Sequence, residues 1–262
     1  MAKRALCVGI NDYPYEDSDL NGCVNDAQAW AEMLTQHFDF PVDDVRIITD
    51  TQATKQAILA GLKDLLKGAK KGDILVFTNS SHGSYLLDRS GDEEKYDQVL
   101  CPHDIADNVV LDDELRELFA ATPNGVQLVA LLDNCHSGGG TRLPTKTRRR
   151  RFLEPEKRGD PTLPDGSVGA PSTGAENYPE SGMRELLLSG CMAHESSYDD
   201  LIGGRYHGAM TYYALETIRN ADYRLTYTQL HNRLGRVLTD ERYDQHPQLE
   251  GTDENKARQV FA

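Results

Sequence analysis

Cysteine, long apolar runs and positive charge are all scarce in this chain of 262 residues. The five cysteines include no Cys-x-x-Cys pair and no spacing typical of a disulfide framework, which favours a reduced, intracellular setting. The N-terminal sequence MAKRALCVGI has no long apolar core and no small-residue cleavage signal, and no stretch of about 20 apolar residues occurs. We therefore expect a cytoplasmic protein with neither a signal peptide nor a transmembrane segment.

The shortage of positive charge sets limits on partners. Lysine and arginine number 28 against 42 acidic residues, so the net charge is −14. Such a balance argues against binding to nucleic acid or to an anionic membrane. It fits a protein that attracts basic partners, although a solvated acidic surface is the plainer explanation.

Short apolar runs bounded by turn residues alternate with segments of helical periodicity. The pattern predicts strands at 5–10, 45–48, 74–77, 128–132 and 185–189, and helices starting at 25 or 26 and spanning 54–66, 111–119, 209–218 and 228–238. The apolar pair Val260-Phe261 is expected to form a last strand. Alternation of this kind predicts an α/β protein with a mostly parallel sheet covered on both faces.

Two of the predicted strands end in reactive residues. The stretch QLVALLDNCHSGGG at 127–140 is an apolar strand that runs into a small-residue turn holding Cys135. The stretch DILVFTNSSHGSY at 73–85 has the same form and holds His82. Open α/β sheets place reactive groups at these carboxyl ends, and a nearby histidine lowers the pKa of a thiol. Either residue alone is more often a core residue, but the pair indicates a nucleophile and its base.

The His-Gly pair at 82–83 and DNCHSGGG at 133–140 resemble the motifs of caspase-like cysteine peptidases, specifically the metacaspases and their bacterial relatives. The resemblance extends over nearly the whole chain, through LNGCVNDA, YDQVLCPHD, LDDEL, LLLSGCMAHESSYD and GAMTYYALETI. It implies a single caspase-like domain over 1–262, with a mostly parallel six-stranded sheet that can include an antiparallel edge strand, and with a flexible inter-subunit linker at about 141–182.

The resemblance also implies roles for individual residues. Cys135 would be the nucleophile, and His82 the general base and later the acid. The amides of Gly83 and Cys135, both in small-residue turns, are the natural donors to the developing oxyanion. The sequence indicates no third member of a triad.

Two acids flank these motifs and predict the specificity. Asp26 and Asp133, with Ser80, match the metacaspase positions that form an acidic pocket for arginine or lysine. A carboxylate at the base of a pocket pairs well with a guanidinium. Alternatively, Asp26 could cap a helix and Asp133 could form a turn.

Calcium is a weaker expectation. Asp97, Asp112 and Asp113 resemble positions that bind an activating calcium in many metacaspases, and hard cations need several oxygen ligands. The position of a further ligand is taken here by Arg142, which would repel the ion, and Asp112 could simply cap a helix. We therefore predict that no cofactor is required and commit to no metal site.

The linker at 141–182 is rich in Pro and Gly and is too long for an ordinary loop. It carries a basic cluster made of Lys146, Arg148, Arg149, Arg150, Arg151, Lys157 and Arg158. A tethered, exposed basic loop is a favoured substrate for an enzyme that cuts after basic residues. We expect self-cleavage within 146–158, most readily after one of the arginines 148–151. The alternative is that the arginines bind an acidic surface.

Together these features predict a cysteine endopeptidase that cleaves proteins after Arg or Lys through a Cys-His dyad. Its partners would be protein substrates with a basic residue at P1, the residue before the cleaved bond. We expect neither nucleic acid nor membrane binding, and we expect a monomer. Two alternatives stay open: a non-catalytic caspase-like scaffold, and a cysteine phosphatase, which the spacing from Cys135 to Arg142 disfavours because six residues intervene where the phosphate cradle needs five.

Overall fold

A six-stranded sheet forms the centre of the computed structural model, which describes residues 1–87, 96–135, 147–158, 180–192 and 195–262. The strand order is β12-β9-β7-β3-β1-β2. The strands are β1 (Lys3–Gly9), β2 (Val45–Thr49), β3 (Ile74–Ser80), β7 (Gln127–Asp133), β9 (Glu185–Ser189) and β12 (Gln248–Glu250). Neighbours pair in parallel except β12, which is antiparallel to β9. The predicted sheet is confirmed.

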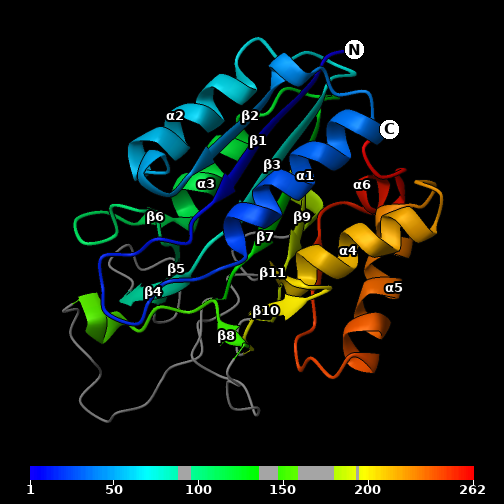
Figure 1. Cartoon of the computed structure of the whole chain (residues 1–262). Coiled ribbons are helices and arrows are strands. Elements are labelled where there is room, and N and C mark those ends of the chain that lie inside the picture. Colours follow the sequence, from blue (N-terminus) through cyan, green and yellow to red (C-terminus); the bar gives the residue numbers. More distant parts are fainter. Residues whose placement is uncertain (88–95, 136–146, 159–179, 193–194) are drawn as a thin grey trace.

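Helices cover both faces of this sheet (Figure 1). They are α1 (Cys23–His37), α2 (Lys55–Leu66), α3 (Asp112–Ala120), α4 (Ala209–Asn220), α5 (Tyr227–Asp240) and the short α6 (Asp253–Ala257). The apolar faces of α1, α4 and α5 pack on one side, and those of α2 and α3 pack on the other. No helix in the described ranges is long and apolar enough to cross a membrane.

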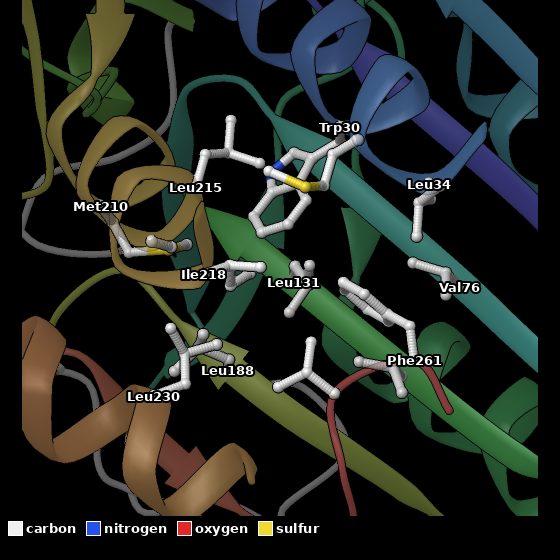
Figure 2. Packing of buried hydrophobic residues seen from close by; sticks show 14 of the residues in the cluster. Trp30, Leu34, Val76, Leu131, Leu188, Met210, Leu215, Ile218, Leu230 and Phe261 are labelled. Atoms are coloured by element: carbon white, nitrogen blue, oxygen red, sulfur yellow. The ribbon is translucent and has the colours of Figure 1, made fainter. Parts of the chain in front are cut away.

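The sheet serves two cores because alternate residues of a strand point to opposite faces. In β1, Ala5 and Cys7 belong to the core under α1, α4 and α5, whereas Leu6 and Val8 belong to the core under α2 and α3. Figure 2 shows the first of these cores, where Trp30 of α1 and residues of α4 meet the sheet. Strands buried on both faces explain the nearly continuous apolar runs of the sequence.

The C-terminal end of the chain differs from the expectation. Val260 and Phe261 do not form a strand; the antiparallel edge strand is β12, earlier in the chain. Phe261 instead fills the core with its ring fully buried, edge-on to Trp30 at 6.0 Å and to Phe38 at 5.1 Å between ring centroids. The apolar pair at the end of the chain is therefore an anchor that packs into the core. Periodicity over two residues cannot distinguish a strand from a buried chain end.

Smaller strands gather at the carboxyl ends of the central strands (Figure 1). One antiparallel sheet joins β4 (Gly83–Leu87), β5 (Tyr96–Leu100) and β6 (Val110–Leu111). Another joins β11 (Arg205–Gly208), β10 (Tyr198–Ile202) and β8 (Arg149–Arg150). The linker expected at 141–182 therefore contributes a strand, β8, to a sheet at this edge.

Removing the Phe261 ring tests its role as an anchor. We expect Phe261→Ala to lower the free energy of unfolding by about 3–5 kcal/mol, because it leaves a cavity among aromatic rings. Urea unfolding in a Cys135→Ala background, which excludes self-cleavage, measures the change. Val42→Ala is the control, because Val42 is 75% exposed and should shift stability by at most about 0.5 kcal/mol. A loss below about 1 kcal/mol for Phe261→Ala would contradict the assignment.

Candidate active site

The register of the central sheet brings His82 and Cys135 to one place. Strands β3 and β7 are parallel neighbours, with Ser80 opposite Asp133. His82 and Cys135 each follow two residues beyond that pair, and both are buried. Adjacent strands thus carry a thiol and an imidazole to the same edge, as the sequence predicts.

Hydrogen bonds hold the backbone and ring of His82. Its amide donates to the hydroxyl of Tyr13 at 2.9 Å, and that hydroxyl donates to the carbonyl of Cys101. Ring atom Nε2 lies 2.7 Å from the carbonyl oxygen of Ser18, so Nε2 carries the proton in the neutral ring. Nδ1 is buried and has no hydrogen-bond partner among the described residues, which leaves it as the basic nitrogen.

A backbone carbonyl occupies the space between the two motifs. The carbonyl oxygen of Arg151 accepts hydrogen bonds from the amides of Gly83, at 2.9 Å, and Cys135, at 3.2 Å. The Arg151 amide in turn donates to the carbonyl of Ser197 at 2.9 Å. Two amides converging on one carbonyl oxygen form the arrangement that stabilises an oxyanion in acyl transfer.

The side chain of Arg151 enters a pocket lined by three carboxylates. Its Nη2 lies 2.6 Å from Asp26 Oδ2 and 3.2 Å from Asp199 Oδ1. Its Nη1 lies 3.3 Å from Asp133 Oδ2 and donates to the Asp133 carbonyl at 3.0 Å. All four side chains are at most 1% exposed. One cation is thus enclosed by three acids in a fully buried site.

Other donors fix each carboxylate in place. Asp133 accepts from the hydroxyl of Ser197 and from both the amide and the hydroxyl of Thr211. Asp26 accepts from the amide of Gly208. These bonds hold the pocket in shape and leave one side of each carboxylate for a guanidinium.

Asp199 is fixed in the same way, by the amides of Asn21 and Gly22 at 2.9 Å. Burial raises the pKa of Asp199, and the charge of Arg151 opposes that shift. A cation in the pocket therefore favours the ionised form of this acid.

The structure brings together two of the three predicted pocket residues. Asp26 and Asp133 meet at Arg151, and neither has its alternative role, since Gly22 caps α1 and Asp133 ends β7. Ser80 is buried in β3 and makes none of the Arg151 contacts found among the described residues, so its role stays a prediction. Sequence reasoning missed Asp199, which has no turn or capping signal around it.

The chain on either side of Arg151 pairs with neighbouring backbone. Strand β8, just before it, pairs with β10, and Phe152 bridges to Gly83. Leu153 donates to the Gly83 carbonyl at 3.0 Å, and the Phe152 ring lies 6.0 Å from that of Tyr85. This part of the linker thus has the extended backbone of a bound peptide.

The calcium candidates lie on β5 and at the start of α3. Arg116 bonds to both Asp112 and Asp113, so a guanidinium occupies oxygens that a cation would need. Burial raises the pKa of Asp112 to about 6. Within the described ranges, no group of three acidic, histidine or cysteine side chains is arranged for a metal, and Arg142 lies outside them. Calcium binding at these residues stays a prediction, which the ion pairs of Arg116 with Asp112 and Asp113 disfavour.

The pKa of His82 provides a test of this geometry. Burial, followed by the charge of Arg151, lowers it to about 4, because both disfavour a cationic ring. We expect the His82 ring in Cys135→Ala protein to titrate with a midpoint near 4 by NMR, with His82→Asn used to assign the signal. Adding Arg151→Gln removes the neighbouring cation and should move the midpoint upward. A midpoint at or above 6.5 in Cys135→Ala protein would contradict the buried placement.

Comparison with known proteins identifies the family of the chain. Residues 3–144 match the family described as metacaspase, peptidase C14 domain. Metacaspase-1 of Meyerozyma guilliermondii is 31% identical over 94% of this chain and 68% of its own length, and Metacaspase-1 of Schizosaccharomyces pombe is 31% identical over 94% and 66%. The chain thus spans about two thirds of the length of these relatives.

Solved structures agree on the fold. A Geobacter sulfurreducens protein, GSU0716, matches with a TM-score of 0.75 at 23% identity, covering 100% of this chain and 99% of its own. Caspase-1 from Spodoptera frugiperda matches with a TM-score of 0.62 at 14% identity, covering 95% and 86%. The predicted caspase-like fold is confirmed, and the chain belongs to the metacaspase family of cysteine-type peptidases.

Proposed function

We propose that the protein is an endopeptidase that cleaves after arginine, and less readily after lysine, using Cys135 and His82. One observation carries the proposal: Arg151 has its guanidinium in the three-carboxylate pocket while its carbonyl oxygen accepts from the amides of Gly83 and Cys135. A residue held at both ends in this way is bound as a P1 residue. Arginine is favoured because its fork of donors reaches several carboxylates, whereas lysine offers a single point of charge.

The proposed reaction gives each of these residues a step. His82 Nδ1 takes the thiol proton of Cys135, and the sulfur attacks the carbonyl carbon of the P1 residue. The carbonyl oxygen becomes an oxyanion that the amides of Gly83 and Cys135 stabilise. The C–N bond then breaks, the imidazolium returns its proton to the leaving amine, and a thioester remains. Water, activated by the same imidazole, hydrolyses the thioester and restores the thiol.

The same geometry supports cleavage at one bond in the linker. Of the candidates, Arg148, Arg149 and Arg150 lie before the pocket, and Arg151 is inside it. Self-cleavage would therefore break the bond between Arg151 and Phe152. Until that bond is cut, the linker covers the site, so the intact chain would be blocked to other substrates.

Single changes in the pocket test the specificity. We expect Asp26→Asn, Asp133→Asn and Asp199→Asn each to lower kcat/KM on peptides with P1 arginine by tenfold or more. A charge-assisted contact to a buried cation is worth about 1.5–3 kcal/mol. Asp240→Asn, at an exposed position on α5, is the charge-matched control and should change little.

Two outcomes would refute this proposal. Hydrolysis of P1 aspartate peptides in preference to P1 arginine would exclude an acidic pocket. If purified protein hydrolyses no peptide and no thiol-directed peptide inhibitor labels Cys135, the chain is a non-catalytic scaffold. Thermal unfolding of each variant separates a lost contact from a lost fold.

Mass spectrometry of incubated protein tests self-cleavage. We expect fragments 1–151 and 152–262 that stay together on gel filtration, because β9 and β12 of the second fragment complete the sheet of the first. Arg151→Gln should abolish this cut, whereas Arg149→Gln should keep it, since the side-chain bonds of Arg149 within the described residues go to the backbone carbonyls of Asp17 and Asp19. Active protein that keeps its full-length mass, or equal cleavage of the Cys135→Ala form, would show that self-processing is wrong.

A further inference from the structure

A second arginine of the linker is also held by a dedicated group of side chains. Arg148 lies three residues before Arg151, and its Nε donates to Asp200 Oδ2 at 2.9 Å. Its guanidinium carbon lies 4.1 Å from the ring centroid of Tyr243 and 5.5 Å from that of Tyr198. A carboxylate and two aromatic faces together surround this cation.

This group, which we call the tyrosine cage (Tyr198, Asp200 and Tyr243), is fixed by its own bonds. The Tyr243 hydroxyl donates to Asp200 Oδ2 at 3.0 Å, and the Tyr198 hydroxyl donates to Asp244 Oδ1 at 2.7 Å. All three cage side chains are buried. A cage that is held by bonds of its own loses little freedom when a cation enters.

Backbone pairing fixes the cage relative to the bond to be cleaved. Strand β8 is antiparallel to β10, with Arg150 opposite Tyr198 and Arg149 opposite Asp199. Strand β10 therefore supplies Asp199 to the three-carboxylate pocket and Tyr198 and Asp200 to the tyrosine cage. An extended peptide that pairs with β10 in this register, with arginine in the pocket, places its fourth residue before the cleaved bond, P4, at the cage.

We infer that the tyrosine cage is a second specificity subsite that selects arginine at P4, so that preferred substrates carry two arginines separated by two residues. The inference rests on the proposed peptidase function and adds a requirement beyond the P1 residue. Arginine is preferred to lysine there because a planar guanidinium stacks on an aromatic ring while its Nε–H bonds to the carboxylate.

A matched set of fluorogenic tetrapeptides tests the inference on self-processed protein. All the peptides have arginine at P1 and the same residues at P2 and P3. The residue at P4 is arginine, lysine or alanine. We expect kcat/KM to be roughly tenfold higher for arginine than for alanine at P4, with lysine between them, as suits a charge-assisted bond plus a cation–π contact. Asp200→Asn and Tyr243→Leu should bring the arginine-to-alanine ratio toward one, and Asp240→Asn should keep it.

The linker offers a second measurement. Arg148→Leu should slow self-cleavage after Arg151 several-fold. Arg149→Leu, which among the described residues removes bonds to exposed backbone carbonyls, should slow it by a smaller factor. If wild-type protein hydrolyses P1 arginine peptides equally well with arginine and alanine at P4, the inference is wrong and the peptidase function stands. If no P1 arginine peptide is hydrolysed at all, both are overturned.

Discussion

Three carboxylates buried side by side cannot all stay ionised unless a cation joins them. Asp26, Asp133 and Asp199 are at most 1% exposed, and the guanidinium of Arg151 lies among them. Removing one partner from such a buried ionic group typically costs about 3–5 kcal/mol, since the remaining charges are left without compensation. The pocket therefore creates a need for positive charge, and the linker meets that need from within the same chain.

Under the proposed function, this need links two parts of the fold. Adjacent strands β3 and β7 present His82 and Cys135, whereas strand β10 presents Asp199 and the backbone that a peptide pairs with. A bound residue touches both parts, because its guanidinium reaches the acids while its carbonyl oxygen reaches the amides of the catalytic turns. Under the proposed function, correct placement of the scissile bond depends on the cation at the bottom of the pocket.

The sequence contained enough to predict the sheet and the thiol–imidazole pair, since long apolar strands followed by small-residue turns carry strong local signals. The sequence was insufficient where the position of a side chain depends on contacts with residues far away along the chain. Asp199 lies 173 residues after Asp26 and enters the pocket only through the pairing of β10. The four arginines at 148–151 look equivalent in sequence. Their side chains take different positions because β8 pairs with β10 in one register. The prediction of a last strand at Val260-Phe261 was wrong because packing, not periodicity, decides the position of Phe261.

Two glycines beside the three-carboxylate pocket, Gly208 and Gly22, leave space for the guanidinium. Gly208 is the N-cap of α4 and has φ −69°, which any amino acid can adopt, so its backbone does not require glycine. A Cβ at this position, however, would collide with Asp133 Oδ2 and with the guanidinium of Arg151, and a Cβ at Gly22 would collide with Asp199 Oδ1. The pocket therefore owes part of its volume to two positions without a side chain. One added carbon at 208 would fill the space that the guanidinium of Arg151 occupies and would leave the charges around it unchanged.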